Sequence, residues 1–181
     1  LSVSSALAGD KVLVSGTLGD HGVAVLSVRE GLDFETELLS DSAPLTGLVR
    51  ALREAAPSVR CMRDPTRGGA ASALNEIAAA SRVGVKLEET AIPLRDEVRG
   101  ACELLGLDPL YVASEGKLVA IVPPDEAERA LAALRAHPLG ANAAVIGSVV
   151  AAHPGVVTMQ SRVGGERIVA MLAGEQLPRI C

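Results

Sequence analysis

Residues 143–171, AAVIGSVVAAHPGVVTMQSRVGGERIVAM, carry most of the information on the fold class. They contain three runs rich in β-branched residues, at 143–150, 156–160 and 166–171. Turns around Gly155 and Gly164-Gly165 separate the runs, a pattern typical of consecutive strands. Because the rest of the chain mixes strands and helices, this strand-rich end indicates an α+β fold, with helices layered on a mixed sheet. A doubly wound parallel sheet is disfavoured.

Strands and helices alternate upstream of this stretch. The expected strands are 11–17, 59–62, 84–88 and 117–122, and the expected helices are 22–31, 44–56, 66–80, 96–105 and 124–137. The last of these helices is strongly amphipathic, with its charges most simply read as a solvated face. Residues 32–44 are a polar, acidic loop. No internal repeat and no long linker divides the chain, so one ordinary domain accounts for it.

The composition excludes several classes of protein. The 181 residues are 49% hydrophobic and 22% charged, as in globular proteins. The net charge is −5 and aromatic residues make up 1%, which argues against nucleic-acid binding. No apolar run is long enough to span a bilayer, and the first residues lack the basic region of a signal peptide. Three widely spaced cysteines form neither a disulfide framework nor a zinc pattern, so we expect the reducing cytoplasm.

The final eight residues, Gly174 to Cys181, are not periodic and end on a thiol. Pro178 cannot continue a helix and favours an extended conformation at Leu177. Fully stretched, the segment could reach on the order of 20 Å at about 3.3 Å per residue. Two interpretations stand side by side. The segment is either an arm that carries a group on the Cys181 sulfur between two places, or a frayed tail, and taken without the rest of the chain it favours the frayed tail.

The sequence SGTLGDHG, residues 15–22, places a glycine turn between an expected strand and an expected helix. Backbone N–H groups at the start of a helix attract anions, which favours a binding site. Asp20 could instead be the helix N-cap, with His21 a polar residue of the first turn. The motif is not a Walker A loop, because no Gly-Lys-Ser/Thr follows. Spacing alone leaves both roles equally open.

The sequence RDPTRGG, residues 63–69, precedes the expected helix that bears Asn75 and Glu76. Two glycines let a phosphate or another backbone approach closely, and arginine suits bidentate contacts to oxyanions. Alternatively, Thr66 caps the helix and the arginines pair with Asp64 and Glu76. We favour the functional interpretation, since two glycines at a helix start cost stability unless something needs the space.

Glu115 lies in ASEGK, residues 113–117, on a turn just before an apolar strand. A partly desolvated carboxylate at the mouth of a strand can act as a base, although by itself such a residue is usually a solvated turn residue. Cys61 and Cys102 have apolar neighbours and read as small core residues rather than nucleophiles. His137 and His153 each precede a proline and read as surface loop residues.

Taken together, several stretches resemble the HypE family of hydrogenase maturation factors along nearly the whole chain. The matching segments are SGTLGDHG, REGLDFETE, CMRDPTRGGAASALNEIA, ETAIP, VRGACELLGLDPLYVASEGKLVAIV and GEQLPRIC. The terminal PRIC and the RDPTRGG stretch are highly specific together, and PRIC argues against a selenophosphate synthetase. The family belongs to the superfamily of aminoimidazole ribonucleotide synthetase and selenophosphate synthetase. Members pair an N-terminal ATP-binding, dimer-forming domain with a C-terminal α+β domain.

The resemblance implies a division of the chain. Residues 1–10 are expected to be the end of a truncated ATP-binding domain or a linker, 11–173 the C-terminal α+β domain, and 174–181 a mobile arm. We therefore expect a piece of a longer protein. ATP and Mg would be bound mainly by the half that is missing here, and the intact protein would be a homodimer. The resemblance leaves open whether this chain alone is an enzyme.

The resemblance also implies an activity for the intact protein, that of a carbamoyl dehydratase. A carbamoyltransferase, HypF, would load a carbamoyl group onto the thiol of Cys181. ATP would then phosphorylate the carbamoyl oxygen, and loss of phosphate and of the nitrogen protons would leave a thiocyanate. The cyanide would pass to iron on a HypC–HypD complex during [NiFe]-hydrogenase maturation.

Residue roles follow from the same resemblance. Cys181 would be the acceptor and Glu115 the base that removes the proton. The phosphate or ATP side of the cleft would be lined by Asp20, His21, Thr66, Arg67, Gly68 and Gly69, and no metal ligand is expected in this chain. The alternative is a non-catalytic docking module that presents Cys181 to partner proteins.

Overall fold

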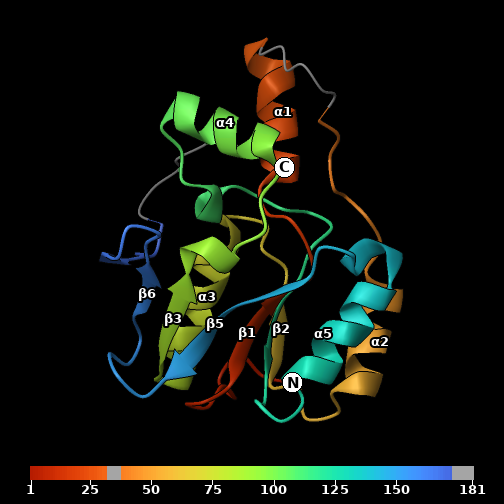
Figure 1. Ribbon diagram of the computed structural model, residues 1–181, viewed down its shortest axis with the longest axis vertical. Coiled ribbons are helices and arrows are strands. Elements are labelled where there is room, and N and C mark those ends of the chain that lie inside the picture. Colours follow the sequence, from red (N-terminus) through yellow and green to blue (C-terminus); the bar gives the residue numbers. More distant parts are fainter. Residues whose placement is uncertain (32–37, 173–181) are drawn as a thin grey trace.

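The structure is a computed structural model that describes residues 1–31 and 38–172. Within these residues, the strands form one mixed sheet in the order β2-β4-β1-β5-β3-β6-β7 (Figure 1). The strands are β1 Lys11–Val14, β2 Cys61–Arg63, β3 Gly84–Glu88, β4 Val119–Val122, β5 Ala144–Val150, β6 Val157–Gln160 and β7 Glu166–Ile168. All adjacent pairs are antiparallel except β3 and β6. The sheet is therefore mixed, as the strand-rich end of the sequence predicted.

The helices confirm the other half of the α+β prediction. They are α1 Asp20–Glu30, α2 Thr46–Ala55, α3 Gly69–Ser81, α4 Asp96–Leu105 and α5 Ala127–Ala136, with short 3₁₀ helices η1 Glu89–Ala91, η2 Pro109–Tyr111 and η3 Pro138–Gly140. Each predicted helix is present, and most have shifted ends. Helix α3 begins at Gly69, three residues after the predicted Thr66, because its N-cap Gly68 adopts a left-handed conformation with φ +69° that a regular helix does not contain.

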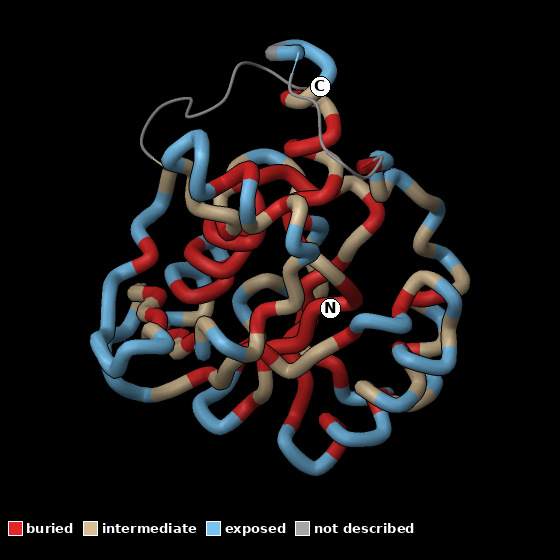
Figure 2. Tube along the Cα trace, turned by 45° about the horizontal axis from the view of Figure 1, so that its top comes forward, coloured by how far each residue is buried: buried red, intermediate tan, exposed pale blue. Residues whose placement is uncertain are grey.

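Alternating side chains on the central strands build a core on each face of the sheet. On one face, Val12 and Val14 of β1 pack with Leu74 and Ile77 of α3. On the other face, Leu13 packs with residues of α2 and α5. Burial of β4 on both faces gives it four consecutive apolar residues rather than alternation. Figure 2 shows this buried interior as a red zone through the middle of the tube, with the exposed turns around it.

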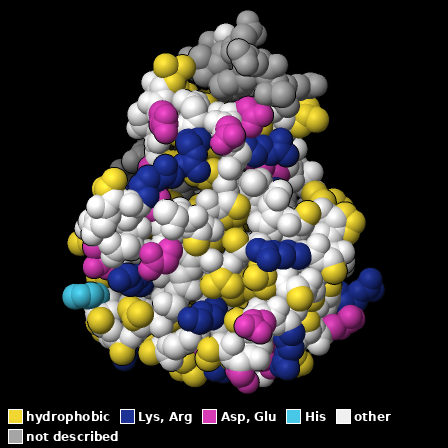
Figure 3. Space-filling model, viewed as in Figure 1, with side chains coloured by type: hydrophobic (Ala, Val, Ile, Leu, Met, Phe, Trp, Pro, Cys, Tyr) yellow, Lys and Arg dark blue, Asp and Glu magenta, His cyan; other side chains and the backbone are white. Residues whose placement is uncertain are grey.

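A third, smaller cluster joins α1 to α4 beyond the end of the sheet. Val23 and Ala24 of α1 pack against Val98, Ala101 and Cys102 of α4. In Figure 1 this helix pair stands above the layered part of the molecule. On the face shown in Figure 3, Lys and Arg side chains lie across the narrow region below the pair, with Asp and Glu interspersed. None of the described helices is long and apolar enough to cross a membrane.

Residues 1–10 pack onto the domain. Ser81 Oγ accepts the Ala6 N–H and donates to the Val3 carbonyl. Asp10 is buried and forms an ion pair with Arg60, with Nε and Oδ2 3.3 Å apart. These contacts tie the first residues to the end of α3 and to the start of β2.

Candidate functional site

Three segments that are distant in sequence meet at one end of the sheet. Antiparallel pairing puts the end of β1 and the end of β2 beside the start of β4, since Val14 and Arg63 are both paired with Val119. Ser114, just before β4, joins the other two segments directly. Its Oγ accepts the Gly19 N–H at 2.9 Å, and its own N–H donates to the Pro65 carbonyl at 2.9 Å. The topology thus brings the three predicted motifs together.

Asp20 is the most buried charged residue of the turn after β1, with 1% of its side chain exposed. It is the first residue of α1 rather than its N-cap; Gly19 occupies the cap position in a left-handed conformation, without a side-chain capping bond. The Thr17 hydroxyl donates to Asp20 Oδ2 at 2.5 Å. Asp20 Oδ1 has no hydrogen-bond partner in the described part of the chain. The carboxylate therefore faces inward instead of capping the helix.

Lys117 and Asp41 complete a buried charge cluster that the sequence did not predict. Lys117 Nζ lies 3.1 Å from Asp41 Oδ2 and 3.9 Å from Asp20 Oδ2, and its side chain is only 12% exposed. Arg95 Nε, from the half-exposed side chain before α4, lies 3.6 Å from Asp20 Oδ2. The only sequence signal was a lone lysine leading a fully apolar strand. No sequence signal marked Asp41, because an acidic loop is normally exposed to solvent.

Burial raises the pKa of Asp20 above its ordinary value of 3.8, although the Thr17 hydroxyl, Lys117 and Arg95 act in the opposite direction. Desolvation of the ionised carboxylate therefore outweighs its partners. The folded protein binds this proton more tightly than the unfolded chain does. The contribution of Asp20 to the free energy of unfolding is accordingly full below pH 3.8 and is lost as the pH rises through the raised pKa.

Replacing Asp20 with asparagine is expected to leave the protein as stable as, or more stable than, the unmodified protein at neutral pH. The neutral amide keeps an acceptor for Thr17 and avoids the desolvated charge. Urea unfolding of both proteins over a range of pH checks this, and the gain must shrink as the pH falls toward 3.8. A loss of stability that grows with pH would show that the ion pairs outweigh desolvation.

The other predicted residue of this turn, His21, lies at the surface of the site. Its Nδ1 is 2.8 Å from the Ser40 hydroxyl, which precedes Asp41 on the segment that runs to α2. His21 is therefore a polar residue of the first helical turn, as one of the two sequence interpretations had it. The acidic residues Asp33, Glu35 and Glu37 of the same loop lie outside the described residues.

Glu115 is partly buried between Ser114 and Gly116. Its main-chain N–H donates to Asp41 Oδ1 at 3.0 Å. Among the described residues its carboxylate has no hydrogen bond or ion pair. The bond to Asp41 thus anchors the backbone of Glu115 at the end of the sheet where the motifs meet.

The turn from Thr66 to Gly69 lies on the other side of Ser114. Thr66 does not cap α3, since the N-cap is Gly68 and no side-chain capping bond forms. Thr66 Oγ1 instead bonds Asp64 Oδ2 at 3.3 Å. Arg63 pairs with Glu76 at 2.6 Å, as the structural interpretation proposed, whereas Arg67 is exposed and has no ion pair among the described residues.

Packing against a neighbouring segment explains why residue 69 is a glycine. A Cβ at this position would lie 2.3 Å from the Leu110 carbonyl oxygen and 2.8 Å from that of Val112, and its φ is +60°. The space that a side chain at Gly69 would need is therefore filled by the backbone of residues 110–112, which belongs to η2 and the residue after it. A neighbouring segment of the same domain thus accounts for the glycine at position 69.

Gly69→Ala is expected to lower the free energy of unfolding by about 1–3 kcal/mol, the usual cost of overpacking, since the neighbouring atoms are backbone and cannot rotate away. Gly100→Ala, in the exposed middle of α4 with no atom within 4 Å of the added Cβ, is the matched control. It should raise stability by about 0.5–1 kcal/mol. Denaturant unfolding measures the change in the free energy of unfolding for each variant. Equal changes in the two variants would contradict the packing argument.

The cysteines fall into two groups. Cys61 and Cys102 are buried, and burial raises the pKa of each thiol to about 11, so both stay protonated at neutral pH. They are core residues, as their apolar neighbours predicted. Cys181 and the whole segment 174–181 lie outside the described residues.

The chain leaves the described structure beside the same turn. Asn75 Nδ2 donates to the Val169 carbonyl, and the Tyr111 hydroxyl donates to the Ala170 carbonyl at 2.8 Å. Leu172 Cδ2 lies 3.5 Å from the point where a Cβ on Gly68 would be. The last described residue is therefore fixed next to the Gly68-Gly69 turn.

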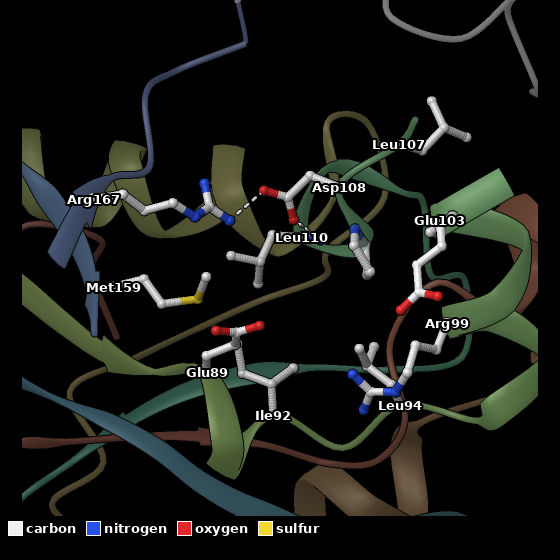
Figure 4. Close-up of a pocket in the computed structure, with 12 residues that line it drawn as sticks. Glu89, Ile92, Leu94, Arg99, Glu103, Leu107, Asp108, Leu110, Met159 and Arg167 are labelled. Atoms are coloured by element: carbon white, nitrogen blue, oxygen red, sulfur yellow. Dashed lines mark hydrogen bonds and ion pairs between the residues drawn. The ribbon is translucent and has the colours of Figure 1, made fainter. Parts of the chain in front are cut away.

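A pocket of about 300 Å³ lies apart from these motifs, between η1, α4, η2 and β6 (Figure 4). Its floor is apolar, with Ile92, Leu110 and Met159, and Arg167 is paired with Asp108 at its rim. It contains none of the predicted site residues. Leu94 lines it, and the next residue, Arg95, reaches Asp20. The pocket and the site are thus separated by this short connection.

The charge cluster does not fit a magnesium site. Mg²⁺ needs oxygen ligands in near-octahedral geometry, whereas Asp20 and Asp41 are already held by a lysine. In residues 1–31 and 38–172, no three His, Cys, Asp or Glu side chains are grouped so as to hold a metal ion. In the described part of the chain, the side chains of this cluster therefore interact with one another through ion pairs and hydrogen bonds.

Comparison with known proteins finds relatives that match the whole chain. The chain is 59% identical over all 181 residues to the "Carbamoyl dehydratase HypE" of Azotobacter vinelandii, of which it spans 53%. It superposes on the crystal structure of hydrogenase maturation protein HypE in complex with ATP with a TM-score of 0.93 and 50% identity, covering 99% of this chain and 55% of the other. For the HypE–HypF complex the TM-score is 0.89 at 45% identity, covering 93% and 55%.

The chain spans about half the length of the curated relatives that it matches. The part that it does span is sufficient to assign the domain. The family described as "AIR synthase related protein, C-terminal domain" matches residues 8–160, which include the whole sheet up to β6 and all three motifs before β4. The chain belongs to this family of AIR synthase related C-terminal domains.

Proposed function

We propose that this chain is the C-terminal part of an ATP-dependent carbamoyl dehydratase of [NiFe]-hydrogenase maturation. One observation carries the proposal. The chain leaves the described structure at Leu172, beside the Gly68-Gly69 turn and at the end of the sheet that holds Asp20 and Glu115. The residues from 173 to 181 could reach about 30 Å when extended, at about 3.3 Å each. The thiol of Cys181 is therefore within reach of the site.

The reaction balances with ATP as the only co-reactant. The carbamoyl group on sulfur, S–C(=O)–NH₂, takes the γ-phosphoryl group of ATP on its oxygen and releases ADP. One nitrogen proton is lost to a base and the C–O bond breaks, with phosphate leaving with that oxygen. Loss of the second nitrogen proton gives S–C≡N. Phosphorylation is needed because an amide oxygen is otherwise a poor leaving group.

Each predicted residue has a part in this scheme. Cys181 holds the group, and Glu115 takes the nitrogen proton with its carboxylate, which has no ion pair within residues 1–31 and 38–172. The phosphate side of the cleft is formed by the turns containing Asp20, His21, Thr66, Arg67, Gly68 and Gly69. Arg67 is the cation of this set that is exposed and without an ion pair in the described structure, so it is suited to a phosphate oxygen.

The remaining parts of the machinery belong to the intact protein. We propose that residues 1–10 link this domain to an ATP-binding half that supplies most contacts to ATP and Mg, that 174–181 form the moving arm, and that the intact protein is a cytoplasmic homodimer. HypF would load Cys181, and a HypC–HypD complex would accept the cyanide. The complex of a related HypE with HypF supports the first of these two partners.

The test follows the C-terminal peptide of the intact protein by mass spectrometry. With a carbamoyl-loading system and no ATP, a carbamoyl adduct on Cys181 is expected, and ATP should convert it into a cyano adduct. An adduct that persists unchanged with ATP would favour the alternative, a docking module that only presents Cys181. No adduct under either condition would contradict both functions.

A further inference from the structure

Lys117 is a nearly buried cation of the site, and the proposed chemistry gives it no task. Its ammonium group is shared between two carboxylates, 3.1 Å from Asp41 Oδ2 and 3.9 Å from Asp20 Oδ2, with 5% and 1% of those side chains exposed. Buried charges of this kind are costly unless something is gained from them. Asp20 also has Arg95, but Asp41 has no second cation among the described residues.

Asp41 links this ion pair to Glu115. One carboxylate oxygen, Oδ1, accepts the main-chain N–H of Glu115 at 3.0 Å, while the other faces Lys117. The backbones are in direct contact as well, because a Cβ on Gly116 would lie 1.6 Å from the Asp41 carbonyl oxygen. Residues 115–117 are therefore held by Asp41 at their first residue, at their middle glycine and at their last side chain.

The opposite side of Glu115 is held independently. Ser114 accepts the Gly19 N–H and donates its own N–H to Pro65. Glu115 thus lies between two anchors, one made of neutral hydrogen bonds and one that depends on a buried ion pair. Only the second can be disturbed by removing a single charge.

We propose that Lys117 and Asp41 are positioning residues that together place the Glu115 carboxylate in the site. The proposal rests on the proposed role of Glu115 as the base. Without the ammonium group, the Asp41 carboxylate is a buried charge without a partner and must turn toward water, which releases the Glu115 N–H. A base that is displaced by about 1 Å can lose on the order of 10²-fold in rate.

The first arm of the test measures the anchor itself, by hydrogen exchange of the 113–118 segment in the intact protein. Lys117→Met should speed the exchange of the Glu115 amide at least about tenfold, the factor that corresponds to about 1.4 kcal/mol. Lys86→Met, on β3 away from the site, is the matched control and should change nothing there. Adding Asp41→Asn to Lys117→Met should slow the exchange again, because a neutral side chain can stay buried and still accept the N–H.

The second arm measures the conversion of carbamoyl-cysteine to thiocyanate. Lys117→Met should slow it by about 10- to 100-fold while carbamoyl loading stays normal, and Lys117→Arg should restore much of the rate. In a Glu115→Gln background the Lys117→Met change should cost nothing more, because residues that act through one group are not additive.

The outcomes separate this proposal from the proposed function. An unchanged exchange rate of the Glu115 amide in Lys117→Met overturns the positioning role. A rate loss in the double variant equal to the product of the two single losses overturns it as well, because Lys117 would then only stabilise the fold. Normal dehydration in Glu115→Gln alone overturns the proposed base and this proposal with it. That failure is recognised in the single Glu115 variant, before any Lys117 variant is measured.

Discussion

Cys181→Ala in the intact protein is expected to abolish carbamoyl acceptance, the largest effect that any single substitution in this chain should have. In the proposed function the thiolate of Cys181 is the nucleophile that takes the carbamoyl group, and alanine has no atom that can replace it. The other two cysteines cannot substitute, since both are buried and burial raises the pKa of each thiol to about 11. Mass spectrometry of the C-terminal peptide after incubation with the loading system gives the result.

The controls for this prediction are Cys61→Ala and Cys102→Ala. Both remove a sulfur atom from a packed core and should lower the free energy of unfolding by about 1 kcal/mol, with loading intact. A carbamoyl or cyano adduct that persists in Cys181→Ala, or that appears on Cys61 or Cys102, would refute the assignment of the acceptor.

Glu115→Gln is expected to leave carbamoyl loading normal and to slow dehydration by roughly 10²–10⁴-fold, the range for removal of one general base. The amide keeps the shape of the side chain and leaves the bond from the Glu115 N–H to Asp41 untouched, so the loss reports on the carboxylate alone. Single-turnover conversion of preloaded carbamoyl protein, followed as the thiocyanate peptide, is the measurement.

Glu128→Gln is the matched control for this second prediction. Glu128 is exposed on α5, which packs on the sheet with α2 rather than at the end where the motifs meet. The same loss of charge there should leave the dehydration rate unchanged. A Glu115→Gln protein that forms thiocyanate at the normal rate would show that Glu115 is an ordinary turn residue, the interpretation that its sequence position alone favours.

Local patterns were enough to predict the elements of this fold. Runs of β-branched residues separated by glycine turns indicated the strands at the end of the chain, and a continuous apolar run indicated β4. The differences lie mainly at the ends of elements. Helix α3 starts at Gly69 and not at Thr66, and both Gly68 and Gly69 have positive φ. The backbone of residues 110–112 packs against Gly69, so the helix start depends on a distant segment. No pattern within 63–80 contains that information.

Some residues of the candidate site could be predicted from local sequence and others could not. Glycine turns with polar residues after β1, after β2 and before β4 can be recognised in the sequence because unusual residues interrupt regular runs. Lys117 and Asp41 could not be recognised, since a lysine before a strand and an aspartate in an acidic loop usually face water. Their burial results from the antiparallel pairing of β1 with β4 and from the segment 38–44 closing over the turn.

The residue order of this chain was therefore sufficient to predict an α+β domain, the three motifs and the cysteine at its end, because hydrophobic period, turn chemistry and residue identity are local properties. Packing between distant segments was needed to bring those motifs to one end of the sheet and to pair Lys117 with two buried carboxylates. Whether a charged side chain is buried depends on which distant segments of the chain pack over it, and this packing exists only in the folded molecule.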